Sequence, residues 1–208
     1  MSILKDFPKM TIIMRGSPYD QVRCVAEAMK KTGTRSVEIS MTSSDALEII
    51  KKISEEFDGD LLVGAGTVRN MTDAVGAVRA KAKFLLSPVI MEREMIEYAH
   101  ENNVLAIPGA FSPSEIYQMY LSGADIIKVF PVSTLELGYG KAVKAPLGNI
   151  PLMGVGGVGL SNAAVLLKSG IDYLGIGSKM FEKKDIIAGN VANLAQSIEK
   201  YKQAIGVI

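Results

Sequence analysis

Short apolar or β-branched segments alternate with amphipathic segments along this chain, at intervals of about 20 to 25 residues. We expect eight strands, over residues 10–14, 36–40, 61–65, 83–86, 104–107, 125–130, 151–155 and 173–176. Helical patterns between them cover residues 20–30, 44–56, 71–80, 90–101, 113–121 and 161–168. Eight strand–helix units without a break in composition predict an α/β fold, a (β/α)8 TIM barrel, with a single domain over residues 1–208.

The composition is that of an ordinary globular protein, and it argues against nucleic-acid and membrane partners. Of 208 residues, 48% are hydrophobic and 22% are charged, which suits one well-buried core. The net charge is +1 without a basic cluster, so we expect no nucleic-acid partner. Residues 1–6 lack the cationic start of a signal peptide, and no run approaches the ~20 apolar residues of a membrane span. We therefore expect a cytoplasmic location, no membrane partner and a small-molecule partner.

The single cysteine and the single histidine do not indicate a metal centre. Cys24 lies in a helical pattern, where one thiol behaves as a small core residue. His100 lies at the polar end of the pattern over residues 90–101, where a hydrogen-bonding side chain suits a helix C-terminus. Because no second histidine or cysteine cluster accompanies His100, we expect neither a zinc site nor a histidine-based triad.

A barrel of this kind builds its site from the C-terminal ends of the strands and the loops that follow them. Those positions can be identified in the sequence. They are Arg15 with Gly16, Glu38 with Ser40, Gly66 with Thr67, Ser87 with Pro88, Pro108 with Gly109, Lys128 with Phe130 and Pro131, Gly156 with Gly157, and Gly177 with Ser178.

Lys128 stands in the apolar run over residues 124–131, where a structural lysine is hard to explain. Burial disfavours the charged amine and lowers its pKa, and a neutral amine can attack a carbonyl carbon to form a Schiff base. The alternative is that Lys128 lies at a strand end and extends its ammonium into water along its aliphatic stem.

Glu38 shares one face of its expected strand with Ser36 and Ser40, whereas Val37 and Ile39 share the other. The apolar pair must meet the helix layer, which leaves the polar set pointing into the barrel. A carboxylate there is costly unless it is paired or used, so Glu38 is the natural acid/base partner of a nucleophilic lysine. The alternative is a purely structural ion pair.

Three strands end in glycine-rich segments, and the seventh and eighth loops of this fold often bind phosphate. Residues 154–159 also match the G-x-G-x-x-G pattern. That match lies in the seventh unit of an even array, so we expect no dinucleotide cofactor. Turn geometry alone is the alternative explanation of these glycines. The phosphate candidates are Gly156, Gly157, Gly177 and Ser178.

Together these segments resemble the class I aldolases that act on 2-keto-3-deoxy-6-phosphogluconate (KDPG) and 4-hydroxy-2-oxoglutarate (KHG), with the related phosphogalactonate (KDPGal) aldolases. The resemblance covers residues 11–180. It lies in Ile13-Met14-Arg15, Val37-Glu38-Ile39, Gly64-Ala65-Gly66-Thr67-Val68, Leu86-Ser87-Pro88, Ile107-Pro108-Gly109 and Lys128-Val129-Phe130-Pro131, followed by Gly156-Gly157-Val158 and Gly177-Ser178.

The resemblance implies a homotrimeric lyase without metal or cofactor, which splits a keto acid into pyruvate and an aldehyde, either glyceraldehyde 3-phosphate or glyoxylate. Lys128 matches the Schiff-base lysine and Glu38 the general acid/base. Thr67 and Arg15 match residues that bind anions, and we expect both to hold the substrate carboxylate. The matching segments also place three residues at the lining of the site, namely Pro88, Pro108 and Phe130.

Departures from the family pattern bear on the substrate. Phosphogluconate-type members carry an arginine where this chain has Thr42 and a threonine where it has Val155. The phosphogalactonate-type members lack that arginine and have the valine, so the chain resembles them more closely at these positions. Val89 replaces the usual glycine or asparagine after Pro88.

Two other functions remain open at the level of sequence. A sugar-phosphate isomerase or epimerase would share the barrel and the phosphate loops but use Glu38 as a proton-abstracting base. A non-catalytic barrel that binds an anionic metabolite would explain the missing arginine. Borohydride reduction in the presence of pyruvate would label Lys128 in an aldolase but not in an isomerase or epimerase. Release of pyruvate from a keto acid would distinguish an aldolase from a non-catalytic barrel.

Overall fold

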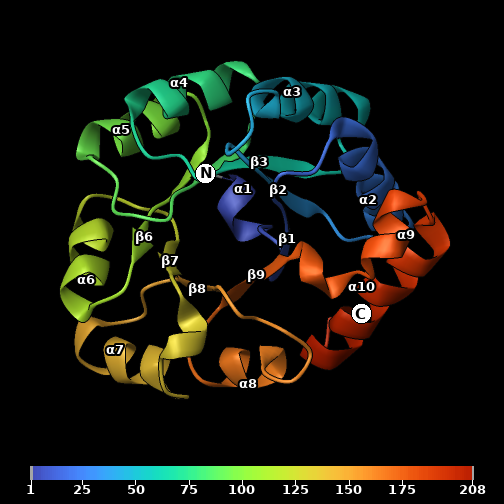
Figure 1. Cartoon of the computed structure of the whole chain (residues 1–208). Helices are drawn as coiled ribbons and strands as arrows, with labels where there is room; N and C mark the ends of the chain where they lie inside the picture. The colour runs from blue at the N-terminus through green and yellow to red at the C-terminus, as the bar shows by residue number, and fades with distance from the viewer. Residues whose placement is uncertain (1, 208) are drawn as a thin grey trace.

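The computed structural model describes residues 2–207, and its centre is a barrel of parallel strands (Figure 1). Every neighbouring pair is parallel, and the order along the sheet is β5-β4-β3-β2-β1-β9-β8-β7-β6. Each of the eight predicted strand regions contains a strand. The strands are β1 (Met10–Met14), β2 (Ser36–Ser40), β3 (Leu62–Gly66), β4 (Phe84–Leu86), β5 (Leu105–Ile107), β6 (Gly109–Ala110), β7 (Ile127–Val129), β8 (Leu152–Val155) and β9 (Tyr173–Gly177).

The fifth barrel position is occupied by two short strands rather than the single strand expected over residues 104–107. β5 pairs with β4, while β6 pairs with β7, so the run from β5 through β6 joins the two edges of the sheet. Pro108 separates the two strands because proline has no N–H to donate to the ladder. The Pro108 carbonyl still accepts a hydrogen bond from the Lys128 amide at 2.8 Å. The barrel is therefore nearly closed, with its one irregular strand beside Lys128.

Helices surround the strands as a ring, and all six predicted helical regions contain a helix (Figure 1). The predicted regions 44–56, 90–101 and 161–168 begin two or three residues too early, because the chain is still in turns or extended there. The helices of the ring are α2 (Tyr19–Thr32), α3 (Ala46–Glu56), α4 (Met71–Arg79), α5 (Arg93–Glu101), α6 (Pro113–Leu121), α7 (Tyr139–Leu147), α8 (Ala163–Lys168), α9 (Lys183–Ile187) and α10 (Val191–Ile205).

Sequence patterns did not indicate α7, α9 or α10. Helix α7 follows Gly138, carries Gly140 in its first turn and contains Pro146, a composition typical of a loop. Gly140 packs against the backbone of Gly170 so closely that a Cβ would lie 2.7 Å from the Gly170 carbonyl carbon. The helix thus docks through this glycine contact together with an apolar stripe of Tyr139, Val143 and Leu147, which packs against the outer core layer. Two 3-10 turns complete the connections, η1 (Val132–Thr134) and η2 (Ser178–Met180).

Apolar side chains form two separate layers, one outside the barrel and one within it. Val37 and Ile39 of β2 lie in the outer layer against the helices, whereas Ser36, Glu38 and Ser40 are buried on the opposite face. This alternation confirms the predicted inward direction of the polar set. The inner layer consists of Phe7, Ile13, Phe84, Leu86, Leu105, Ile107, Ile126, Met153 and Val155.

The short helix α1 (Ser2–Lys5) lies across the centre of the ring and leads into Phe7 (Figure 1). The Phe7 ring packs edge-on against Phe84 at 5.3 Å and against Tyr173 at 5.6 Å. Phe84 and Tyr173 are the first residues of β4 and β9. The N-terminal end of the barrel is thus closed by aromatic packing, which leaves the other end for a site.

Cys24 and His100 have the structural roles expected for them. Cys24 is buried in the outer core layer. His100 lies in the last turn of α5, and its Nε2 is 2.9 Å from Oδ2 of Asp125. That carboxylate also accepts the amide of Ala106 at 2.8 Å, so the contact ties α5 to β5. Over residues 2–207, no helix is long and apolar enough to cross a membrane.

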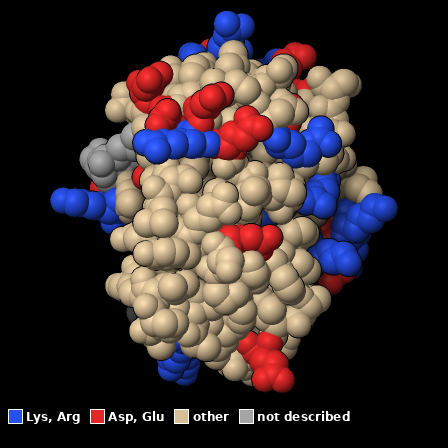
Figure 2. All heavy atoms as spheres, turned by 90° about the vertical axis from the view of Figure 1, so that its left-hand side faces the viewer, with Lys and Arg blue, Asp and Glu red and all other residues tan. Residues whose placement is uncertain are grey.

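The face over α6 is unusually poor in charge (Figure 2). It is the side on which α5, α6 and α7 lie in Figure 1, with charged side chains concentrated around its edges. The loops and helix between β4 and α7 also carry many of the exposed large apolar residues. They are Val89, Ile90, Phe111, Tyr117, Tyr120, Leu121 and Leu137.

Candidate active site

Lys128 lies in β7 with only 3% of its surface exposed. Ile126, two residues earlier, belongs to the inner apolar layer, so Lys128 extends into the barrel above it. Its Nζ is 4.8 Å from the centre of the Phe130 ring. Burial lowers the pKa of Lys128 to about 8; the negative charge of Glu38 raises that pKa, while Arg15 lowers it further. A substantial fraction of the amine is therefore neutral near pH 7 to 8.

Glu38 lies in β2, is 1% exposed and packs over Gly66 of β3. A Cβ at Gly66 would overlap Oε1 of Glu38, so the glutamate can occupy this position only because Gly66 has no side chain. Burial raises the pKa of Glu38 to about 7, although the positive charges of Lys128 and Arg15 oppose the rise. Oε2 of Glu38 is buried and has no hydrogen-bond partner among the described atoms. The carboxyl can thus donate or accept a proton near neutral pH.

Lys128 and Glu38 influence each other without forming a close ion pair. Within residues 2–207, no carboxylate oxygen lies within 4.0 Å of Lys128 Nζ. Each nevertheless moves the pKa of the other, as expected for two charges inside one barrel. The structure therefore brings together the two residues predicted as nucleophile and acid/base, with a separation greater than that of a salt bridge.

Thr67 follows β3 in a left-handed conformation, with φ of 60°. This conformation is strained for a β-branched residue, and such strain is concentrated at functional sites. The Thr67 hydroxyl lies 2.8 Å from the hydroxyl of Ser40, at the end of β2. The residue is thus held at the rim of the barrel beside the strand that carries Glu38.

A cavity of about 510 Å³ lies at the C-terminal ends of β8 and β9. It brings together Arg15, Phe130 and the four phosphate candidates. Gly156 and Gly157 have φ values of 90° and 75°, which side chains rarely tolerate, and the Phe130 ring lies against Gly156. Phe130 contacts both this cavity and Lys128, so the cavity adjoins the Lys128 amine.

Five predicted site residues lie outside this cavity lining, namely Lys128, Glu38, Thr67, Pro88 and Pro108. Pro108 is buried and its carbonyl accepts a hydrogen bond from the Lys128 amide, which places it directly beside Lys128. The Pro88 backbone packs against Gly109, where a Cβ would lie 2.5 Å from the Pro88 carbonyl carbon. Pro88 therefore packs against β6, the strand that pairs with β7.

Lys179, Met180 and Tyr201 also line the cavity, and sequence patterns did not identify them. Lys179 directly follows Ser178, so its place after the eighth barrel strand was a usable signal. Tyr201 comes from the C-terminal helix α10 and is largely buried. No local pattern could place it here, because only the folding of α10 over the barrel brings it to the loop after β8.

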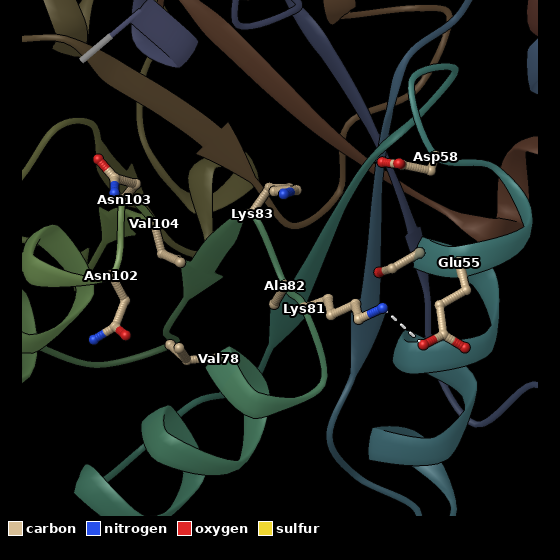
Figure 3. A pocket seen from close by; sticks show the side chains of 10 residues that line it. Glu55, Asp58, Val78, Lys81, Ala82, Lys83, Asn102, Asn103 and Val104 are labelled. Carbon is tan, nitrogen blue, oxygen red and sulfur yellow. Dashed lines mark hydrogen bonds and ion pairs between the residues drawn. The ribbon is translucent and has the colours of Figure 1, made fainter.

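A second cavity, of about 530 Å³, lies at the opposite end of the barrel (Figure 3). Lys83 and Val104 in its lining immediately precede β4 and β5. Lys81 points across to α3 and pairs with Glu55 at 2.8 Å. The N-terminal face of this fold serves stability rather than chemistry, and this cavity is far from Lys128 along the strands. Within the described residues, no group of three or more His, Cys, Asp or Glu side chains could hold a metal ion.

Comparison with known proteins agrees with this geometry. The family model described as "Aldolase: KDPG and KHG aldolase" matches residues 1–197. A Rhizobium meliloti (strain 1021) protein named "Probable 2-dehydro-3-deoxy-6-phosphogalactonate aldolase" is 30% identical over 184 residues, 88% of this chain and 86% of the relative. The solved "Native KDPGal structure" has a TM-score of 0.84 at 26% identity, over 96% of this chain and 97% of that chain.

One further solved structure is a cube-shaped protein cage designed by fusing symmetric oligomeric domains. Its TM-score is 0.84 at 26% identity, over 95% of this chain and 73% of that chain. The family match confirms the resemblance found in the motifs. This chain belongs to the KDPG and KHG aldolase family.

Proposed function

We propose that the protein is a class I aldolase that cleaves a 2-keto-3-deoxy-6-phospho sugar acid, KHG or both, through a Schiff base on Lys128. The observation that carries the proposal is the buried Lys128, with its pKa lowered to about 8, in one barrel interior with Glu38. An isomerase would need Glu38 but would have no use for an amine of lowered pKa at this position. Membership of an aldolase family favours the lyase as well.

Schiff-base formation follows from the two shifted pKa values. Neutral Lys128 Nζ attacks C2 of the keto acid, and the resulting carbinolamine loses its hydroxyl as water. Glu38 in its protonated form supplies the proton to that leaving hydroxyl. Because the pKa of Glu38 is about 7, the protonated carboxyl is available near neutral pH, and it becomes the carboxylate after the transfer.

Cleavage then uses Glu38 in the opposite direction. The Glu38 carboxylate takes the proton of the C4 hydroxyl, directly or through water, as the C3–C4 bond breaks. The electron pair of that bond moves to the iminium nitrogen of Lys128, which leaves an enamine of pyruvate and a free aldehyde. Protonation at C3 and hydrolysis of the iminium then release pyruvate and restore the amine.

The remaining predicted residues would position the substrate. Arg15 and Thr67 are proposed to hold the carboxylate, and the amides of Gly156, Gly157 and Gly177 to hold the phosphate with Ser178. Arg15 is close enough to Lys128 and Glu38 to affect both pKa values, which supports a place beside the reacting carbons. The glycine-rich loops after β8 and β9 line the cavity, which supports the proposal that they bind the phosphate.

The galactonate epimer is the proposed preferred substrate. Thr42 is exposed in the turn after β2 and supplies no cation there, whereas Val155 is buried and lines the cavity. Pyruvate release from KDPGal, KDPG and KHG, measured side by side, tests the preference, and a faster reaction of KDPG contradicts it.

Borohydride reduction in the presence of pyruvate tests the Schiff base. Mass spectrometry is expected to find the reduced adduct on Lys128, and Lys128→Met abolishes it. Lys144→Met is a matched control, because the Lys144 side chain is also only 14% exposed but pairs with Asp172 at 2.5 Å. Retained labelling in Lys128→Met, or no labelling of folded parent protein, overturns the proposal.

A homotrimer and a cytoplasmic location are part of the same proposal. The charge-poor face over α6, with Leu121 66% exposed, supports burial against further copies of the chain (Figure 2). Similarity to a structure built from symmetric oligomeric domains supports assembly as well. A free, buried Cys24 without a disulfide partner is consistent with a reducing compartment.

A further inference from the structure

The cavity at the ends of β8 and β9 has two cations, Arg15 and Lys179, and no carboxylate in its lining. Throughout the described chain, no Asp or Glu oxygen lies within 4.0 Å of either side chain's charged nitrogens. The neighbouring hollow of about 460 Å³, which Lys179 also borders, adds Lys183 and again no carboxylate. Two unpaired cations in one concave site favour an anionic ligand.

The pairing of β1 with β9 explains why these two charges come together. Ile13 of β1 is in register with Gly177 of β9. Arg15 and Lys179 each follow two residues later, at the ends of these adjacent strands. Like charges at neighbouring strand ends repel each other unless an anion lies between them. The fold therefore places both cations beside the predicted phosphate loops.

We propose that Lys179 is a specificity-determining residue whose ammonium binds the distal phosphate of the keto acid. The inference rests on the proposed function, because Phe130 contacts both Lys128 and the cavity, so a substrate bound to Lys128 extends toward Lys179. A phosphate carries a charge of about −1.5 to −2 near pH 7, which a single cation does not neutralise. Lys179 thus favours phosphorylated substrates over their unphosphorylated analogues.

Direct titration with inorganic phosphate tests the binding step without any turnover. We expect the Kd from calorimetry to rise about tenfold in Lys179→Met, because a charge-assisted hydrogen bond is lost. Lys179→Arg keeps the charge and is expected to stay within about threefold of the parent. Lys168→Met removes an exposed lysine that lines neither cavity and is expected to leave the Kd unchanged. Equal affinity of Lys179→Met and the parent overturns the proposal.

Kinetics with a matched substrate pair tests the consequence for specificity. For 2-keto-3-deoxy-6-phosphogalactonate, Lys179→Met is expected to raise KM about tenfold while kcat stays within about twofold. For unphosphorylated 2-keto-3-deoxygalactonate, KM is expected to be unchanged. An equal loss for both substrates contradicts a role in phosphate recognition.

Borohydride trapping of pyruvate separates failure of this inference from failure of the proposed function. Lys179→Met is expected to be labelled on Lys128 as the parent is, because Lys179 does not touch the reacting carbons. If folded parent protein is not labelled, the aldolase proposal fails, while the phosphate titration still decides whether Lys179 binds the anion.

Discussion

Lys128 and Glu38 are buried in one barrel interior, with their pKa values displaced from the ordinary values toward neutrality. Burial of either charge alone is costly, and mutual attraction offsets only part of that cost. Two buried ionisable groups therefore lower the stability of the inner layer, and fractions of neutral amine and of protonated carboxyl are present together near neutral pH. This combination is the condition that Schiff-base chemistry requires of its two groups.

The pH dependence of imine formation is expected to respond in opposite directions to two substitutions. Imine formation needs the neutral amine, so the acid limb of its rate rises with pH as Lys128 loses its proton near its pKa of about 8. Loss of the protonated Glu38 carboxyl lowers the rate on the alkaline side. Glu38 raises that pKa, so Glu38→Gln lowers it and moves the rise to lower pH. Arg15 lowers that pKa, so Arg15→Met moves the rise to higher pH. The rate of cyanoborohydride trapping at saturating pyruvate, measured against pH, gives the midpoint of the rise for each variant. If both midpoints move in the same direction, Glu38 and Arg15 do not affect the Lys128 pKa as described.

Gly66→Ala is expected to impair proton transfer without touching the nucleophile. Its Cβ would occupy the position of Glu38 Oε1, so the carboxyl must move. We expect kcat for pyruvate release to fall by about 10²-fold or more, because a displaced carboxyl can no longer transfer protons to and from the substrate. Gly76→Ala in α4 is the control, since only the flexible Leu47 lies near, at 3.1 Å. A folded Gly66→Ala protein with parental kcat would show that Glu38 does not act from this position.

At the scale of elements, strand alternation predicted which side chains point into the barrel, whereas the packing of loops and helices could not be predicted in this way. Glu38 points inward because Val37 and Ile39 pack against the helix layer. The five residues of β2 are enough to predict this alternation. The break at Pro108 and the whole of α7 depend on how separate segments pack. The cavity needs β1, the loops after β8 and β9, and Tyr201 of α10 together. Such contacts are set by tertiary packing, so local periodicity could not predict them.

Ser112→Ala is expected to destabilise the protein through helix α6. The Ser112 hydroxyl accepts the Glu115 amide at 3.3 Å, and the Glu115 carboxylate accepts the Ser112 amide at 2.7 Å, which completes a capping box. Loss of the cap is expected to cost about 1 kcal/mol of unfolding free energy. Urea unfolding at fixed protein concentration measures it, with Ser122→Ala at the other end of the same helix as control. A loss in Ser122→Ala as large as that in Ser112→Ala contradicts the capping explanation.

The same box makes the stability of α6 depend on pH. Backbone N–H groups of Ser112 and Phe111 lower the pKa of Glu115 in the folded state. A carboxyl with a lowered folded pKa stabilises the fold above its unfolded pKa, and that contribution is lost as pH falls through the folded value. Glu115→Gln is therefore expected to lower the urea midpoint at pH 7 and to have a smaller effect in acid. An effect that grows toward low pH contradicts this sign.

At the scale of the whole molecule, the two ends of the barrel and the side over α6 differ in the side chains that they expose. Phe7 closes the N-terminal end with Phe84 and Tyr173, while the opposite end carries Lys128 and the cavity lined by Arg15 and Lys179. The side over α6 is neither closed by an element of this chain nor covered with charge (Figure 2). Monomeric proteins rarely leave a large apolar patch exposed, so this side fits burial between copies.

The parent protein is accordingly expected to have a mass of about three times the 22.3 kDa chain in sedimentation equilibrium. Leu121→Asp is expected to shift it to the mass of one chain with an intact barrel by circular dichroism, since an interface would bury an unpaired carboxylate. Ile187→Asp is the control, because Ile187 is 63% exposed, similar to Leu121, but lies in α9 on the far side of the ring (Figure 1). A monomeric parent, or dissociation by Ile187→Asp rather than by Leu121→Asp, contradicts assembly through the α6 face. Because a stable contact needs about 1,000 Å² of buried surface, the single charge at Leu121 is sufficient only if that residue lies near the centre of the interface.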